Sequence, residues 1–354
     1  MKKLYLVELL RFISSLSVLI YHYKIFFFEF NGYLKLNLNN EIYLLPFNYI
    51  FNLFYKHGDY GVQMFWCISG FIMSYVYLNR EKITTKEFFM NRFSRLYPLH
   101  FITLILVTII QILSMNLTGE YQVFHLNDIY HFFLNLFFIS GWGFHNGFSF
   151  NQPIWSVSME LIAYTFFFIS LKYINILKLK NFNLGIMALL LFIFIFVDKN
   201  FMPPNMNDTI LNCLSLFILG SIVYYLMKKL KKSFFILFSI LLLIISVIGN
   251  FKILIFCPAI LMIFIYLEDF FKDFINKPLF LILGNVTYST YLLHTPLTII
   301  SILVFKGNKE IYLNPVFFVI YFLILISLSI YTYYLIEKKL QNKIRSIYIK
   351  KIKE

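Results

Sequence analysis

Long apolar runs separated by short polar segments dominate the pattern of this chain. A helix needs about 20 consecutive apolar residues to cross a bilayer, and most of the runs approach or exceed that length. The eleven runs lie at 4–28, 60–78, 97–115, 128–141, 154–171, 184–198, 209–227, 233–249, 252–267, 280–305 and 313–336. The pattern predicts an all-α integral membrane protein.

The basic residues between the runs decide how many of them cross. Lysine and arginine gather on the cytoplasmic side of membrane proteins, so we expect the basic segments 79–95, 172–180, 228–232 and 338–354 in the cytoplasm. If all eleven runs crossed, 79–95 and 172–180 would lie on opposite sides. The run 128–141 has only fourteen residues, so we expect it to be re-entrant or interfacial. The result is about ten transmembrane helices, with both termini cytoplasmic.

Composition excludes a soluble globular protein. Of the 354 residues, 60% are hydrophobic and 21% aromatic, and the mean hydropathy is +0.75. The net charge of +14 comes from short basic clusters between apolar runs, which the positive-inside rule explains better than a nucleic-acid footprint does. We expect one membrane-embedded domain over 4–337 and a basic cytoplasmic tail over 338–354. The protein is predicted to be a multi-pass protein of the plasma or inner membrane, with its first run retained as an anchor.

The first run carries three ionisable residues, Glu8, Arg11 and His22, in an otherwise apolar helix. Such residues are costly inside a membrane and usually serve a function. Arg11 and His22 are eleven residues apart, which is about three helical turns or 16 Å along one face. Glu8 precedes Arg11 by three residues and can neutralise it. The alternative interpretation is a charge pair that only anchors the helix, but it leaves His22 unexplained.

Two further patterns lie in the second and third runs. Ser69-Gly70-Phe71 provides small residues that allow close packing of helices. Arg92 and Arg95 are i, i+3 neighbours at the expected cytoplasmic mouth of the third helix. They are either a positive-inside anchor or a clamp for phosphate groups, which paired guanidinium groups bind well.

The run 154–171 contains an isolated acid. Ser156 and Glu160 share a helix face below Trp155, which suits the outer interface. No basic residue lies within this run, so Glu160 needs a partner from elsewhere. His22 lies at a compatible depth. A purely structural pairing of Glu160 is the alternative.

The last two runs add hydroxyl, imidazole and carboxyl groups. Tyr288, Tyr291 and His294 lie in the run 280–305, where they can line a cavity or form hydrogen bonds between helices. Glu337 closes the final run and is followed by the basic tail, whose charge it can balance.

The order of these patterns resembles acyltransferase family 3, a family of polytopic membrane proteins that O-acylate surface sugars and other extracytoplasmic acceptors. The resemblance covers about residues 4–337. Two positions depart from the family pattern: Val157 stands where leucine is usual, and lysines follow Glu337 where a proline is usual. The motifs that carry the resemblance are Arg-x10-His (Arg11, His22), Ser-Gly-Phe (Ser69 to Phe71), Arg-x-x-Arg (Arg92, Arg95), Trp-Ser-x-x-x-Glu (Trp155, Ser156, Glu160) and Tyr-Ser-x-Tyr-Leu-x-His (Tyr288, Tyr291, His294).

The resemblance implies a membrane-bound O-acyltransferase that needs no bound cofactor or metal. Its donor would be an acyl-CoA, in the simplest case acetyl-CoA, and its acceptor a hydroxyl of a surface polysaccharide or lipid-linked sugar. His22 would be the general base, with Glu160 orienting it and stabilising its charge. The donor site would comprise Arg92 and Arg95 with Arg11 deeper in the membrane. The cavity for the acceptor or acyl chain would be lined by Glu8, Trp155, Ser156, Tyr288, Tyr291 and His294.

Two other classes of function fit some of these features. A proton-coupled transporter also places ionisable groups within membrane helices, although this chain lacks paired Gly/Pro-interrupted helices in matching halves. A non-catalytic protein of polysaccharide assembly is the second alternative. The three cysteines, Cys67, Cys213 and Cys257, lack the spacing of metal ligands and are expected to be small core residues.

Overall fold

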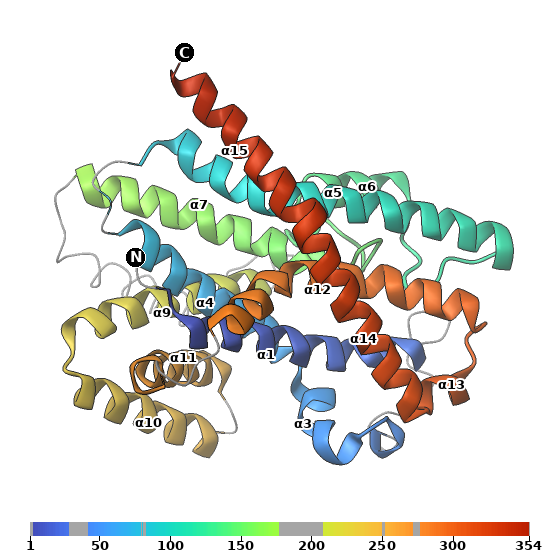
Figure 1. Cartoon of the computed structure of the whole chain (residues 1–354), viewed down its shortest axis with the longest axis horizontal. Coiled ribbons are helices and arrows are strands. Elements are labelled where there is room, and N and C mark those ends of the chain that lie inside the picture. The colour runs from blue at the N-terminus through green and yellow to red at the C-terminus, as the bar shows by residue number, and fades with distance from the viewer. Residues whose placement is uncertain are drawn as a thin grey trace. The chain divides into compact units, whose positions relative to one another are not determined.

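The computed structural model describes residues 3–27, 42–78, 80, 83–176, 208–249, 252–271 and 277–353, and this part of the chain is helical without strands (Figure 1). The predicted run 184–198 lies outside these residues. The helices are α1 (Tyr5–His22), η1 (Tyr23–Phe27), η2 (Ile42–Leu44), α3 (Asn48–His57), α4 (Tyr60–Tyr77), α5 (Thr85–Thr118), α6 (Ile129–Leu136), α7 (Ile154–Ile176), α9 (Asp208–Lys229), α10 (Lys232–Ile248), α11 (Ile253–Phe270), α12 (Lys277–Val304), α13 (Lys309–Leu313), α14 (Pro315–Thr332), η4 (Tyr333–Glu337) and α15 (Lys338–Lys353).

Most apolar runs coincide with a helix, and the differences concern helix ends and short helices. Within the described residues, six helices are long and apolar enough to cross a membrane, which indicates a multi-pass membrane protein. The run 128–141 forms only the eight-residue α6 followed by turns. The segment 79–95 was expected to be a loop, but α5 begins at Thr85. Arg92 and Arg95 therefore lie within a helix, which continues through Pro98 into the apolar run.

The distribution of side chains on helix α10 and in part on α14 is typical of a membrane protein. Apolar side chains are exposed, and small polar side chains are buried between helices. Helix α10 exposes Leu237, Leu241 and Ile244 while it buries Ser239 and Ser246. Helix α14 also exposes Leu323 and Ile324 and buries Ser329, but it buries larger side chains such as Phe322 as well. Lipid tails solvate exposed leucine and isoleucine without penalty, whereas hydroxyl groups need hydrogen-bond partners between helices.

The chain divides into two compact units, which are described separately. Unit 1 comprises Met1–Ser14, Tyr60–Thr85 and Met159–Gly284, and unit 2 comprises Ser15–Asp59, Lys86–Ser158 and Asn285–Glu354. The boundary between the units falls inside α1, α7 and α12.

In unit 1, helices α4 and α9 pack closely through two glycines. A Cβ atom on Gly70 would lie 1.8 Å from the carbonyl oxygen of Phe217, and one on Gly220 would lie 1.9 Å from that of Cys67. The Ser221 hydroxyl donates to the carbonyl of Gly70 at 3.2 Å. The packing role expected for the small pair at positions 69 and 70 is confirmed for Gly70, because only a residue without Cβ allows this approach.

Replacing Gly70 with alanine is expected to lower the free energy of unfolding by about 3 kcal/mol, because the added methyl group must push two helix backbones apart. Thermal unfolding of the purified protein in detergent measures the effect. Gly249→Ala is the matched control, since its nearest non-neighbouring atom is 3.1 Å away. Similar melting temperatures for the two variants would contradict the packing role of Gly70.

The start of α1 is held in unit 1 by a buried acid. Glu268 of α11 is 2% exposed, and its carboxylate accepts hydrogen bonds from the backbone N–H groups of Tyr5 at 2.9 Å and Leu6 at 2.6 Å. The first N–H groups of a helix lack partners within the helix, and the helix dipole favours a negative charge there. Glu268 thus fixes the end of the helix that carries Glu8 and Arg11.

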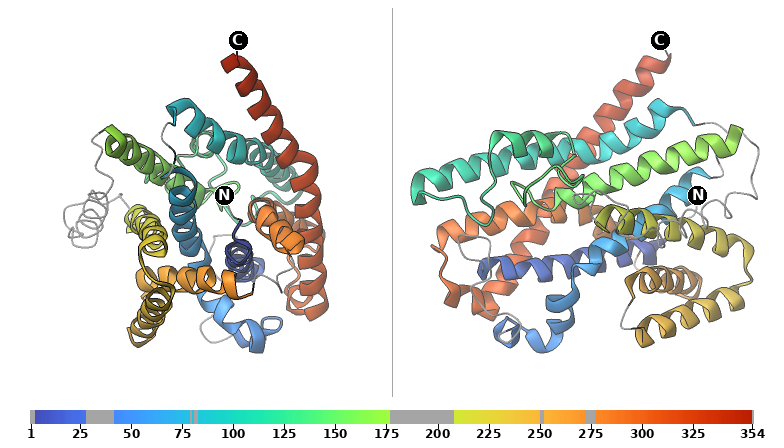
Figure 2. Two further views of the ribbon diagram at one scale, coloured as in Figure 1. Left: turned by 60° about the vertical axis from the view of Figure 1, so that its left-hand side comes forward. Right: turned by 180° about the vertical axis from the view of Figure 1, so that it is seen from behind.

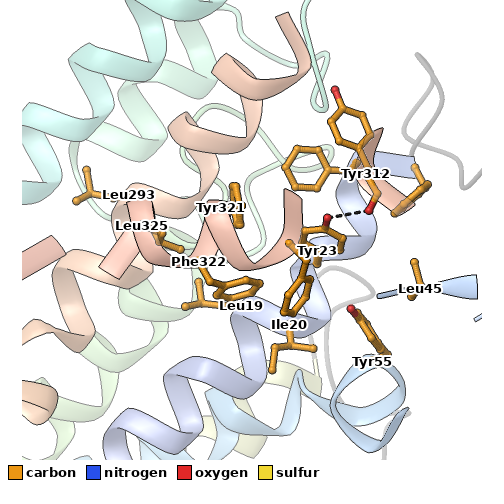
Figure 3. Close-up of a cluster of buried hydrophobic side chains, with 13 residues drawn as sticks. Leu19, Ile20, Tyr23, Leu45, Tyr55, Leu293, Tyr312, Tyr321, Phe322 and Leu325 are labelled. Atoms are coloured by element: carbon orange, nitrogen blue, oxygen red, sulfur yellow. Dashed lines mark hydrogen bonds between the residues drawn. The ribbon is translucent and has the colours of Figure 1, made fainter. Parts of the chain in front are cut away.

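An aromatic and aliphatic cluster forms part of the core of unit 2. It joins the end of α1 and η1 to α12, α13 and α14 (Figure 3). The Tyr23 hydroxyl donates to the carbonyl of Tyr312 at 2.8 Å, which satisfies a polar group inside an apolar cluster. This cluster begins directly beside His22 and immobilises the end of α1.

The basic tail is itself a helix. Helix α14 continues through the π-helical turn η4 into α15, which Figure 1 shows as the long red helix at the C-terminus. The Arg345 side chain donates to the hydroxyl of Ser94 on α5 at 3.2 Å. The left view of Figure 2, turned by 60° from Figure 1, shows the same continuous helix.

Candidate active site

Two histidines from distant parts of the chain meet in unit 2. Nδ1 of His22, the last residue of α1, lies 2.9 Å from Nε2 of His294 on α12. The His294 side chain is buried, with 2% exposed, whereas His22 is partly exposed. Nδ1 of His294 lies 2.7 Å from the carbonyl oxygen of Tyr291, one turn earlier. The sequence had indicated both histidines but not their contact with each other.

The tyrosines of the same motif join α12 to two other helices. The Tyr291 hydroxyl lies 2.8 Å from the hydroxyl of Ser156, near the start of α7, and Ser156 also donates to the carbonyl of Pro153 at 3.1 Å. The Tyr288 hydroxyl donates to the carbonyl of Leu96 on α5 at 2.7 Å. Tyr288, Tyr291 and His294 therefore each bind a different element of unit 2, while Trp155 lies partly exposed beside Ser156.

A residue that the sequence analysis missed, Asn151, completes this part of the site. Pro296 lies inside α12 and has no N–H group, so the carbonyl of Leu292 loses its partner within the helix. The buried Asn151 side chain donates its amide to that carbonyl at 3.0 Å. The proline in the run 280–305 was a signal that such a donor is needed, but it does not identify which residue supplies it.

Asn151→Ala is expected to lower the free energy of unfolding by about 1–3 kcal/mol, because it leaves a buried carbonyl without a donor. The double variant Asn151→Ala with Pro296→Ala restores a helical N–H group to that carbonyl and should recover most of the loss. Unfolding measurements on the four members of this cycle test the coupling. Strict additivity of the two substitutions would refute it.

A second group in unit 2 is a buried ion pair. Arg95 of α5 donates to Oε1 of Glu337, and the Ser289 hydroxyl donates to its Oε2 at 2.6 Å. Glu337 is 2% exposed and lies in the π-helical turn η4, a local geometry that often accompanies functional sites. The sequence allowed Glu337 to balance the basic tail, and its described partners are instead on α5 and α12. Arg92 lies one turn before Arg95 and is partly exposed.

In unit 1, Glu8 and Arg11 form the ion pair that their spacing predicts. Nη1 of Arg11 lies 2.8 Å from Oε2 of Glu8, and both side chains are about one-fifth exposed, at 22% and 23%. Glu8 packs on Gly284 of α12, where a Cβ atom would come within 2.0 Å of the carboxylate oxygen. The glycine at position 284 thus leaves room for the acid that orients Arg11.

Glu160 also has partners within unit 1. The hydroxyls of Ser69 and Tyr164 both donate to its Oε1 atom. Ser69 therefore has a polar contact that the sequence analysis did not foresee, in addition to the packing of Gly70. His22 belongs to unit 2 and Glu160 to unit 1, and the pairing of these two groups stays a prediction.

The other histidines and the cysteines have local contacts. Asp128 caps α6 by accepting from the backbone N–H of His131 at 2.8 Å, and this hydrogen bond lowers the pKa of the Asp128 carboxyl. Partial burial lowers the pKa of His145. His100 is buried and bonds the carbonyl of Asn135 at 2.9 Å. The three cysteines are buried and unpaired, as expected of core residues.

The described helices carry imidazole, hydroxyl and guanidinium side chains, which are groups that can take part in acyl transfer to a hydroxyl. A family model described as an acyltransferase domain matches residues 4–334, nearly the whole chain. No curated protein and no solved structure matches the chain. The match spans all five motifs that carry the resemblance. The chain therefore belongs to acyltransferase family 3.

Proposed function

We propose that this membrane acyltransferase moves an acyl group, acetyl in the simplest case, from cytoplasmic acyl-CoA to a hydroxyl of an extracytoplasmic or lipid-linked sugar, in the plasma or inner membrane. The observation that carries the proposal is an imidazole, His22, held by a hydrogen bond at the end of a membrane helix in an acyltransferase domain. Imidazole is the most frequent general base for activating a hydroxyl near neutral pH.

In the proposed reaction, His22 takes the proton of the sugar hydroxyl while the oxygen attacks the thioester carbonyl. The carbon–sulfur bond then breaks, the acyl group remains on the sugar oxygen, and the CoA thiolate leaves with a proton. Glu160 is assigned the role of stabilising the transient imidazolium charge. The sequence of steps requires no further reactant.

We assign the binding of the donor, acyl-CoA, to the arginines. The nucleotide end of acyl-CoA is polyanionic and cannot enter hydrocarbon, so a cationic site at the cytoplasmic side suits it. In this proposal, Arg92 and Arg95 bind the nucleotide end of acyl-CoA at the cytoplasmic side. Arg11 lies nearer the reacting thioester. Arg95 also binds Glu337, so a variant at Arg92 tests donor binding without breaking that ion pair.

Arg92→Ala is expected to raise the KM for acetyl-CoA about 10- to 100-fold, the loss of one charge-assisted contact, and to leave the apparent affinity for the acceptor unchanged. Steady-state rates with purified protein measure both constants. Lys86→Ala is the control, because Lys86 is an exposed cation on the same helix. Equal effects of Arg92→Ala on donor and acceptor would refute the assignment.

The direct test of the function is acceptor-dependent release of CoA thiol from acetyl-CoA by the purified protein in lipid nanodiscs. Mass spectrometry of surface glycans from cells with and without the protein should show the O-acyl mass and the sugar that carries it. Unchanged glycans together with no thiol release would refute the proposal.

A proton-coupled transporter is the second candidate, favoured by the ion pairs of Glu8 with Arg11 and of Arg95 with Glu337 inside membrane helices. The two candidates differ in one measurement. A transporter releases no thiol from acetyl-CoA and instead accumulates substrate in proteoliposomes when a proton gradient is applied.

A further inference from the structure

The hydrogen bonds around His294 determine where its proton lies. Nδ1 of His294 faces the carbonyl oxygen of Tyr291 at 2.7 Å. A carbonyl only accepts, so Nδ1 must carry the proton. Because His294 is buried and its described partners are the backbone of Tyr291 and Thr290 and an imidazole, with no acid among them, a charged ring would be costly there. In the neutral ring, Nε2 then has a free lone pair and can only accept.

The position of the proton on His22 follows from that on His294. Its Nδ1 atom lies 2.9 Å from the accepting Nε2 of His294, so Nδ1 of His22 must donate. The two rings are nearly parallel, with centroids 5.0 Å apart and planes inclined by 27°. This separation is close to the sum of the 2.9 Å gap and the two ring radii, so the rings meet edge to edge, as a ring-to-ring hydrogen bond requires.

We propose that His294 is the positioning residue of the active site: it holds His22 in the tautomer with the proton on Nδ1, so that Nε2 of His22 is the atom that takes the proton from the acceptor hydroxyl. This inference rests on the proposed function. In this inference, His294 orients the ring of His22, and Glu160 stabilises the charge that forms on that ring. The carbonyl of Tyr291 ends the chain of hydrogen bonds, so the proton taken by Nε2 stays on His22 until the leaving thiolate accepts it.

The surroundings of His294 suit a positioning role. The Thr298 hydroxyl donates to its carbonyl at 2.8 Å, and the Tyr321 hydroxyl contacts the same carbonyl at 3.3 Å. Tyr291, whose carbonyl sets the tautomer, is held by Ser156. The backbone of α12 at His294 is therefore held by contacts from α12 and α14, and the carbonyl that sets the tautomer belongs to the protein and not to the substrate. In hydrolases with a Ser-His-Asp triad, an acid performs this orienting task; here an imidazole does so.

The test compares two replacements of His294 in the full-length protein in nanodiscs, with acetyl-CoA as donor and extracted surface polysaccharide as acceptor. His294→Leu removes the accepting atom and is expected to lower the turnover rate about 10²- to 10⁴-fold, the contribution of a correctly protonated general base. The KM for acetyl-CoA should stay unchanged. His294→Gln offers an amide oxygen that accepts the same bond and should recover most of the rate.

A wild-type rate in His294→Leu, or equal losses in the leucine and glutamine variants, would overturn the proposal. Failure of the proposed function gives a different result, because the wild-type protein would then release no thiol. If only the assignment of His22 as base failed, His22→Ala would retain activity whatever happens at His294. A loss in His22→Ala with a wild-type rate in His294→Leu leaves the function standing and removes only this inference.

A second measurement does not depend on the folding of a variant at position 294. Nitrogen-15 NMR of the wild-type protein with labelled histidines distinguishes protonated from unprotonated ring nitrogens, and the signals of His22 are those absent from His22→Ala. We expect a proton on Nδ1 and none on Nε2, the opposite of the tautomer favoured in water. A proton on Nε2 of His22 would overturn the proposal.

Discussion

Replacing His22 with alanine is expected to reduce acyl transfer by about 10³-fold or more, because the acceptor hydroxyl loses the group that removes its proton; general base catalysis contributes about 10²- to 10⁴-fold. His22 is partly exposed at the end of α1, so its loss leaves a small gap instead of a cavity in the core. Binding of acetyl-CoA should therefore survive, and only turnover should fall. Thiol release and glycan O-acylation measure the effect.

The control for this substitution is His125→Ala, since His125 is an exposed histidine and its loss should leave the rate unchanged. The comparison also tests the third class of function. A non-catalytic assembly protein would support O-acylation of the glycan equally well with alanine at position 22, provided that the variant is expressed at wild-type level. Equal activity of the two variants would thus contradict the proposed base.

Removing the carboxylate of Glu337 is expected to lower the free energy of unfolding by about 3–5 kcal/mol, the usual cost of breaking a buried ion pair by deleting one partner. Glu337 receives hydrogen bonds from both Arg95 and Ser289, so Glu337→Ala leaves a guanidinium group and a hydroxyl without their acceptor. The loss should appear as a lower melting temperature in detergent.

Two further variants decide whether the pairing with Arg95 causes this loss. Glu310→Ala removes an exposed acid and should change stability by less than about 0.5 kcal/mol, as expected of surface substitutions. The double variant Arg95→Met with Glu337→Leu removes both charges and should be more stable than Glu337→Ala, because no uncompensated buried charge remains. If the loss of unfolding free energy in the double variant equals the sum of the losses in the two single variants, the pairing with Arg95 does not cause the instability of Glu337→Ala.

Much of the helical framework could be predicted from local patterns. Apolar runs of sufficient length predicted α1, α4, α7, α9, α11, α12 and α14 close to their observed bounds, because a backbone in lipid must satisfy its own hydrogen bonds. The i, i+3 spacing of Glu8 and Arg11 predicted their ion pair, since one helix brings them together. The short helices α3 and α13 were missed because they have only ten and five residues, too few to stand out as runs that could cross a membrane.

The partners of the site residues were less predictable. Glu160 was expected to need a partner from elsewhere, and in unit 1 that partner is Ser69, 91 positions away, together with its helix neighbour Tyr164. Pro296 indicates that the carbonyl of Leu292 needs a hydrogen-bond donor from another part of the chain, but it does not indicate that Asn151 is that donor. For Glu337 the sequence offered only the neighbouring lysines of the tail as possible partners, whereas its described partners lie on α5 and α12.

By itself, the sequence determined that the protein consists of membrane helices and which ionisable residues lie within them, because both depend on spacing along one helix and on the cost of charge in lipid. Only the tertiary structure decided which of these residues meet. His22 and His294 are 272 positions apart, and their contact depends on how α1 packs against α12 in unit 2. No local pattern encodes that packing, because it results from the side chains of several helices at once.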